Sequence, residues 1–382
     1  MFQRAIEKQI NMYLQNSDEK TLFIWGPRRS GKTTLLDKFA RRLAVKKYNF
    51  DFASDREKFA PRREILEHIV RENRIVLIDE IQNYPEATVM IKLLHDEFHT
   101  KVIATGSSEL RQKTKQFDTL AGRYTQLYCL PLSMHEIFEN QTPNADDQQE
   151  FINQMATTLQ IFGAYPEIYT KTEASEKDRI DTLQNIVDAY VLKDIVTIYE
   201  LKDQKLAKDI LTKIALQLGS EVSVREIAKS LGAYPSTVSN YIEIFIKNYI
   251  LIPLPSFKTN LRRAVSENRK LYFYDLGIRN MLIRDFRDLD LRPDKGGVFE
   301  NFIIAEIEKQ KKLTNANVTS YFYREYGGKE IDIVLEDYKK NYITMEIKTD
   351  RGKVRNIFPL PNKPYIVNSL NYFEKISDIV HE

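Results

Sequence analysis

The sequence contains few of the residues that would build a disulfide framework or a histidine metal site. It has a single cysteine, Cys129, within an apolar strand-like run, and five histidines without metal-ligand spacing. One cysteine excludes a network of disulfide bonds. We therefore expect Cys129 to be a small core residue in a fold that apolar packing stabilises.

Long apolar runs are also missing. No stretch approaches the roughly 20 residues of a transmembrane helix, and the N-terminus carries Glu7 without the apolar segment of a signal peptide. The net charge of +3 is too small to indicate a nucleic-acid partner by itself. These absences predict a cytoplasmic protein that has no membrane partner. The length of 382 residues predicts two to four domains.

A phosphate-binding loop follows the first predicted strand, residues 21–25. The loop and the start of the next helix comprise Gly26, Pro27, Arg28, Arg29, Ser30, Gly31, Lys32, Thr33 and Thr34. Glycines let the backbone N–H groups turn toward phosphates, and the helix N-terminus adds partial positive charge. We expect Lys32 to reach the β- and γ-phosphates of a nucleoside triphosphate and Thr33 to bind Mg²⁺.

Two carboxylates end a second predicted strand. The apolar run 74–79 closes on Asp79 and Glu80, and a continuous apolar run is typical of a parallel strand buried on both faces. Asp79 would hold Mg²⁺ directly or through water. Glu80 would take a proton from the attacking water. The alternative is a strand that ends in a solvated turn.

A third apolar run, residues 101–105, leads to Ser107 and Ser108. If this strand lies between the other two, one of these serines points at the γ-phosphate and its water. The pattern leaves open which serine it is, and an ordinary serine turn is the alternative.

These segments resemble the AAA+ superfamily, in which the extra strand carries a polar sensor of the γ-phosphate. More narrowly, the chain is similar to predicted prokaryotic AAA+ ATPases with a C-terminal restriction-endonuclease-like domain of unknown function. The matching segments are 26–35, 77–82, 105–108, 120–124, 130–133 and the C-terminal patterns below. The resemblance implies hydrolysis of ATP with Mg²⁺ by a homo-oligomer in which a neighbour's arginine completes the site. Arg111 and Arg123 are candidates, and a structural salt bridge is the alternative for either.

The predicted fold class is α/β. Strand candidates alternate with helical patterns, which implies a parallel sheet with helices on both faces; they are 21–25, 47–52, 74–79, 101–105 and 124–130. We expect an AAA+ ATPase core over residues 1–150 and a helical lid over 151–218. A winged-helix domain over 219–289 and a small α/β restriction-endonuclease-like domain over 290–382 would follow.

Residues 224–232 and 236–247 carry a helix-turn-helix pattern. Ser236 or its neighbour would cap the second helix, and the strand-like runs 249–254 and 270–274 would form a wing.

Basic residues gather between the two wing strands, namely Lys258, Arg262, Arg263 and Arg269. They would meet the phosphates of double-stranded DNA. The second helix offers only Lys247 as a base, so a protein-contact module is the alternative interpretation.

Charged residues recur in the last hundred residues. A predicted helix at 297–307 carries Glu300, and strands at 330–335 and 342–349 carry Asp332, Glu346 and Lys348. Strand alternation places Glu346 and Lys348 on one face. The arrangement is similar to the nuclease site of restriction-endonuclease-like proteins, and a docking or structural domain is the alternative.

The sequence thus predicts an ATP-hydrolysing enzyme, and it leaves open whether the winged helix contacts DNA or a protein. One alternative is a nucleotide-controlled binding module with little turnover, and another is an ATP-regulated nuclease.

Overall fold

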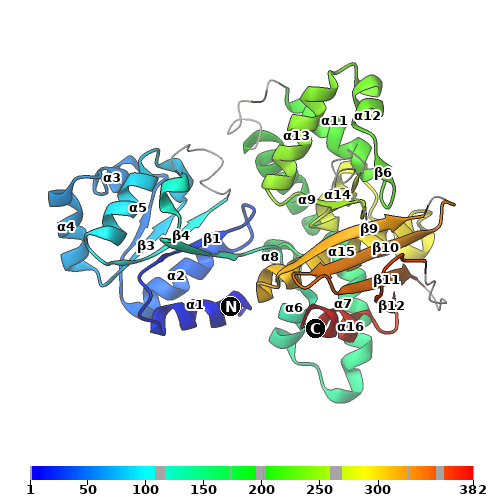
Figure 1. Ribbon diagram of the computed structural model, residues 1–382, viewed down its shortest axis with the longest axis horizontal. Coiled ribbons are helices and arrows are strands. Elements are labelled where there is room, and N and C mark those ends of the chain that lie inside the picture. Colours follow the sequence, from blue (N-terminus) through cyan, green and yellow to red (C-terminus); the bar gives the residue numbers. More distant parts are fainter. Residues whose placement is uncertain are drawn as a thin grey trace. The chain divides into compact units, whose positions relative to one another are not determined.

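The computed structural model describes residues 2–107, 117–171, 174–194, 201, 203–258, 269–325, 327–349 and 357–381. They form two compact units, residues 1–130 and residues 131–382. Figure 1 colours the first unit blue to cyan.

The helices and strands of the first unit follow the predicted alternation. They are α1 (Ile6–Gln15), β1 (Thr21–Trp25), α2 (Lys32–Leu43), β2 (Lys47–Asn49), α3 (Ala53–Glu57), α4 (Arg63–Glu72), β3 (Ile75–Asp79), η1 (Ile81–Asn83), α5 (Ala87–Asp96), β4 (Lys101–Gly106), η3 (Phe117–Leu120) and β5 (Tyr124–Tyr128).

These strands form a parallel five-stranded sheet in the order β2-β3-β4-β1-β5. Strand β4 therefore lies between the two motif strands β3 and β1, as the position of Ser107 required. Every residue of β1 is buried, because helices cover both faces of the sheet. Helices α1 and α2 lie on one face, and α4 and α5 lie on the other (Figure 1).

The second unit begins with helices and ends with a sheet. Its elements are α6 (Met134–Gln141), η4 (Ala145–Asp147), α7 (Gln148–Phe162), α8 (Pro166–Tyr169), α9 (Glu176–Ile186), the π-helical segment η5 (Val187–Asp194), α11 (Gln204–Ala215), β6 (Glu221–Val222), α12 (Val224–Leu231), α13 (Pro235–Lys247), β7 (Leu251–Pro255), β8 (Arg269–Phe273), α14 (Leu276–Ile283), η7 (Leu289–Leu291), α15 (Lys295–Thr314), β9 (Val318–Arg324), β10 (Glu330–Asp337), β11 (Tyr342–Lys348), β12 (Lys363–Asn368) and α16 (Tyr372–His381).

The first unit ends at residue 130, whereas the predicted ATPase core extends to residue 150. The segment after residue 130 is anchored on α15 of the second unit. The backbone N–H of Met134 donates to Glu306 Oε2 over 2.8 Å, and Lys309 Nζ donates to the carbonyl of Leu132 over 3.0 Å. Both partners on α15 are buried. These contacts hold α6 in the second unit.

One hydrophobic core joins the predicted lid to the predicted winged helix. It runs from Ile161 and Phe162 on α7 through α9, α11 and α13 to Leu271 and Phe273 on β8. The predicted boundary between residues 218 and 219 therefore does not separate two cores.

The helix-turn-helix elements occur where the pattern placed them, with α12 ending before Gly232 and α13 beginning at Pro235. The N-cap prediction was wrong, because Tyr234 occupies that position and makes no side-chain capping bond. A small antiparallel sheet in the order β6-β8-β7 stands beside these helices. The two-residue strand β6 was not predicted.

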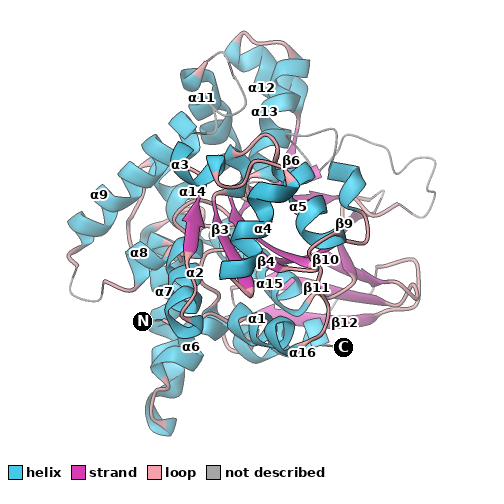
Figure 2. Ribbon diagram, turned by 90° about the vertical axis from the view of Figure 1, so that its left-hand side faces the viewer, coloured by secondary structure: helices cyan, strands magenta, loops and turns pink. Residues whose placement is uncertain are grey.

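The C-terminal sheet has the order β12-β11-β10-β9, which Figures 1 and 2 show side by side. Strands β9, β10 and β11 pair antiparallel, and β12 pairs parallel with β11. The C-terminal sheet is connected to the chain that follows β7 of the smaller sheet by a hydrogen bond of 2.7 Å, which the N–H of Phe257 donates to the carbonyl of Phe322 on β9. Across the described segments, no helix is long and apolar enough to cross a membrane.

Candidate functional site

The phosphate-binding loop connects β1 to α2. Gly31 occupies the N-cap position of α2 with φ at 94°, a left-handed conformation that glycine adopts without steric cost. Ser30 Oγ closes the loop with a hydrogen bond of 2.8 Å to the carbonyl of Pro27. Thr33 stands in the first turn of α2, so a phosphate at this helix N-terminus would lie near its hydroxyl.

Lys32 is buried within this loop, with only 4% of its surface exposed. Its ammonium donates to the carbonyls of Gly26 and Pro27, over 2.8 and 2.7 Å. Burial lowers the pKa of Lys32, and the nearby carboxylates, Glu80 foremost, act in the opposite direction. The ammonium is thus already in the loop and can exchange backbone carbonyls for phosphate oxygens.

Asp79 ends β3 beside the neighbouring strand β4 and is 1% exposed. The hydroxyl of Thr105 donates to Asp79 Oδ1. Lys47 Nζ lies 3.4 Å from Asp79 Oδ2 and 2.7 Å from Asp37 Oδ1. Asp79 therefore has a fixed orientation, with Oδ1 bound by Thr105 and Oδ2 facing Lys47.

Glu80 adopts a left-handed conformation, with φ at 54°. For a residue with a side chain this costs about 1–3 kcal/mol, and such strain gathers at functional sites. The amide of Gln82 donates to Glu80 Oε2 and, over 3.1 Å, to Ser107 Oγ. The proposed base and the proposed sensor are thus joined through one side chain, which the sequence did not single out.

Arg4 is another contributor that the sequence analysis missed. This buried guanidinium donates to the carbonyl of Ser30 and to that of Leu130, each over 2.6 Å, and to Cys129 Sγ over 3.2 Å. It ties the phosphate-binding loop to the end of the first unit. Cys129 is buried, as expected for a core residue.

Of the two arginines that are candidates for completing a neighbour's site, the structure describes Arg123. Arg123 Nε pairs with Asp96 Oδ1 over 2.7 Å, and this hydrogen bond lowers the pKa of Asp96 to about 2. The salt bridge anticipated as the alternative therefore exists within the chain. Arg111 and Ser108 lie outside the described residues.

The basic residues of the wing are described only at its two ends. Arg262 and Arg263 lie outside the described residues, and Lys258 is exposed. Arg269 pairs with Glu243 of α13 over 2.7 Å. On the second helix, Asn240 and Lys247 are exposed. A DNA-contacting role for this module stays a prediction.

The C-terminal candidates converge on β10 and β11. Lys348 Nζ lies 3.7 Å from Asp332 Oδ2 and 3.6 Å from Glu346 Oε2, so Glu346 and Lys348 share a face. The N–H of Ile347 donates to Asp332 over 2.6 Å. Burial raises the pKa of Asp332.

Glu300 has other partners. It accepts a hydrogen bond of 2.5 Å from the hydroxyl of Tyr272, and Lys270 Nζ lies 3.4 Å away. Lys270 is 1% exposed and also pairs with Glu330. Burial raises the pKa of Glu300, and the charge of Asp332 adds to this while Lys270 opposes it. Among the side chains that the structure describes, no three acidic, histidine or cysteine groups are arranged to hold a metal ion.

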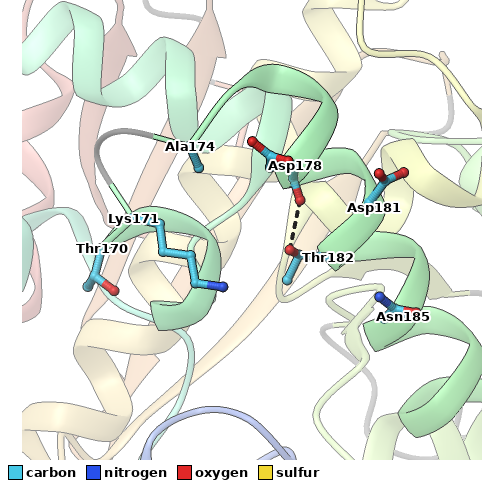
Figure 3. Close-up of a pocket in the computed structure, with 7 residues that line it drawn as sticks. All are labelled: Thr170, Lys171, Ala174, Asp178, Asp181, Thr182 and Asn185. Atoms are coloured by element: carbon cyan, nitrogen blue, oxygen red, sulfur yellow. Dashed lines mark hydrogen bonds between the residues drawn. The ribbon is translucent and has the colours of Figure 1, made fainter.

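Two surface hollows lie in the second unit. One has a volume of about 740 Å³ beside β10 and β11. The other, of about 600 Å³, lies between α8 and α9, and Figure 3 shows Lys171 on one side and Asp178 and Asp181 on the other. The phosphate-binding loop lines neither of them.

Comparisons with protein families divide the chain into three parts. Residues 18–138 match a family described as "AAA domain". Residues 153–291 match "Domain of unknown function (DUF8612)", and residues 295–358 match "Domain of unknown function (DUF4143)".

Two curated relatives carry no functional name. The chain is 23% identical to an "Uncharacterized protein" of Haemophilus influenzae over 278 residues, which is 68% of each chain. It is 22% identical to "Uncharacterized protein MJ1637" of Methanocaldococcus jannaschii, over 72% of this chain and 65% of the relative.

Solved structures overlap only partly with the chain. RuvB of Thermotoga maritima, a Holliday junction branch migration motor, is 17% identical with a TM-score of 0.31, over 65% of this chain and 89% of RuvB. The Orc1 protein of Aeropyrum pernix, solved in complex with DNA, is 13% identical with a TM-score of 0.30, over 73% of this chain and 92% of Orc1. TM-scores of this size establish no shared activity. The family match and the strand order agree: the first unit has a P-loop α/β fold, and residues 18–138 are similar to the AAA domain.

Proposed function

We propose that the first unit binds ATP with Mg²⁺ and hydrolyses it. One observation carries the proposal. Lys32, Asp79, Glu80 and Ser107 follow or end the three adjacent parallel strands β1, β3 and β4, at the same edge of the sheet. Ligands of open parallel sheets bind at this edge, beyond the carboxyl ends of the strands.

Lys32 and the N-terminus of α2 would bind the phosphates. The ammonium exchanges the carbonyls of Gly26 and Pro27 for phosphate oxygens, so a buried cation gains anionic partners. Thr33 and Asp79 would hold Mg²⁺, and hydroxyl and carboxylate oxygens are the ligands this ion prefers. When bound, the ion neutralises charge on the phosphates.

Glu80 would accept a proton from the attacking water, and Ser107 would sense the γ-phosphate. Ser108 remains the alternative sensor. Completion of the site by a neighbour's Arg123 would require that residue to leave Asp96, whose carboxylate it binds in the single chain. Arg111 is the other candidate for this role.

The test separates binding from chemistry. Glu80→Gln keeps the side-chain shape and removes the base, so ATP should still bind while turnover falls about 10²–10⁴-fold. Glu57→Gln makes the same chemical change on the exposed surface of α3 and serves as the control.

Calorimetry with ATP and Mg²⁺ measures binding, and steady-state phosphate release measures turnover, with and without double-stranded DNA. The oligomeric state is measured in the same buffer. Wild-type turnover in Glu80→Gln would assign the base elsewhere. Tight ATP binding without turnover in the wild type would favour a nucleotide-controlled binding module.

A further inference from the structure

Gln82 lies buried between the proposed base and the proposed sensor, with 6% of its surface exposed. Its amide nitrogen donates to Glu80 Oε2 and to Ser107 Oγ, the latter over 3.1 Å. Its amide oxygen accepts from the backbone N–H of Ser107 over 3.3 Å. One side chain therefore contacts both functional groups and the strand end that carries one of them.

The partners of this amide fix its orientation. If it were turned over, its oxygen would face the Glu80 carboxylate and its NH₂ group would face the N–H of Ser107, and both contacts would be repulsive. Gly106, the residue before Ser107, leaves room for the Gln82 side chain. A Cβ at this position would lie 2.7 Å from Gln82 Oε1 and 2.5 Å from the ring of Trp25.

This orientation determines what the two partners have left to offer. Ser107 Oγ accepts a hydrogen bond from Gln82, so its own hydrogen is directed elsewhere and can be donated to a phosphate oxygen. Glu80 accepts from Gln82 at Oε2, so Oε1 is the oxygen that would receive a proton from water. Gln82 sets up both groups at once.

We propose that Gln82 is a positioning residue that couples γ-phosphate sensing by Ser107 to the placement of Glu80. The inference rests on the proposed ATPase function. A γ-phosphate that binds Ser107 fixes Oγ, which fixes the Gln82 amide and through it the carboxylate. ADP lacks that group, so the link from Ser107 through Gln82 to Glu80 has one anchor fewer and the carboxylate is less constrained.

Gln82→Glu tests this coupling, because it keeps the size of the side chain and removes both N–H donors. It also sets a second carboxylate beside Glu80, and the Ser107→Ala background below separates that charge effect from the coupling. Turnover should fall about 10- to 100-fold with little change in KM for ATP. The preference for ATP over ADP, measured by calorimetry, should fall about 3- to 10-fold. The matched control is Gln126→Glu on the half-exposed face of β5, which should leave both quantities unchanged.

A double variant tests whether the effect of Gln82→Glu acts through Ser107. In a Ser107→Ala background, Gln82→Glu should no longer alter the ATP-over-ADP preference, because the sensor through which it acts is gone. Equal effects of Gln82→Glu with and without Ser107 would overturn the coupling, as would an unchanged preference and turnover in the single variant.

The outcomes also separate this inference from the proposed function. A wild type that binds ATP without hydrolysing it, while Gln82→Glu loses the ATP preference, would reject hydrolysis and keep the coupling. Normal turnover in the wild type and in Gln82→Glu would keep hydrolysis and reject the coupling. A wild type that binds no ATP rejects both.

Discussion

Lys32 of the first unit and Lys270 of the second are both buried lysines near carboxylates, with 4% and 1% of their surfaces exposed. Lys32 donates to two backbone carbonyls. Lys270 is paired with the carboxylates of Glu300 and Glu330. A buried ammonium needs compensating partners. Lys32 has neutral partners that an anion can replace, whereas Lys270 has charged partners of its own.

The pKa values express the same difference. Burial lowers the pKa of Lys32, and Glu80 and Asp79 offset this only in part. Burial also acts to lower the pKa of Lys270, but Glu300 and Glu330 outweigh it and the pKa is raised. Lys32 can therefore bind an incoming anion, whereas Lys270 is already neutralised by carboxylates and has a structural role.

Loss of Lys270 should have the largest effect on stability. Lys270→Met leaves the buried Glu300 without its cation, whereas Glu330 keeps its pair with Arg324. The unpaired Glu300 should destabilise the second unit by about 3 kcal/mol. Lys229→Met removes an exposed lysine from α12 as the control. The single tryptophan, Trp25, lies in β1 and reports on the first unit, so its fluorescence transition should not move while the circular dichroism transition does.

Adding Glu300→Gln to Lys270→Met should restore part of the lost stability, because the unpaired carboxylate is removed. An unchanged dichroism transition in Lys270→Met would mean that the ion cluster contributes nothing to the second unit.

Lys32→Ala should show the opposite pattern. It removes a charge-assisted contact to phosphate worth roughly 1.5–3 kcal/mol, so ATP affinity should fall about 10- to 100-fold. The Trp25 unfolding transition should stay within about 1 kcal/mol, because the carbonyls that Lys32 leaves can bind water. Unchanged affinity in calorimetry would contradict the phosphate-binding role, and a large loss of stability would make Lys32 structural like Lys270.

The sequence predicted the first of these lysines but not the second. Lys32 stands in a local pattern, where strand, glycine loop and helix follow each other within a few residues. The partners of Lys270 lie 30 and 60 residues further along the chain. No spacing rule reports such contacts, and the sequence pattern indicates only that Lys270 begins a strand.

The same distinction holds within the first unit. Thr105 meets Asp79 because β4 pairs in parallel with β3, and the strand register alone would have indicated it. Lys47 and Arg4 reach the site from strand and chain ends whose side-chain directions depend on tertiary packing. Gln82 lies only two residues after Glu80, but its contacts depend on the turn of η1. The spacing of apolar residues in the sequence does not predict that turn.

The pH dependence of ATP binding should follow from the lowered pKa of Lys32. Phosphate favours the charged ammonium and so raises this pKa in the complex. At a pH between the lower pKa of the free protein and the higher pKa of the complex, ATP binding takes up a proton. ATP affinity therefore falls as the pH rises from the first of these pKa values to the second.

Calorimetry above about pH 8, where ATP phosphates are fully ionised, in two buffers of different ionisation enthalpy measures this uptake. Lys32→Arg keeps its charge and should abolish it. The same uptake in both proteins would assign the proton to another group.

The smallest effect is expected at the C-terminal acids. Lys270 neutralises Glu300, and Lys348 lies between Asp332 and Glu346, so cations of the chain already occupy the places beside these carboxylates. Burial raises the pKa values of Glu300 and Asp332, which disfavours the ionised forms that a metal needs. We expect the wild type to leave DNA intact in Mg²⁺ or Mn²⁺, as a docking or structural domain would. Metal-dependent cleavage that disappears in Asp332→Ala and persists in Lys32→Ala would establish a nuclease. In that case a bound metal ion would have to displace Lys270 from Glu300.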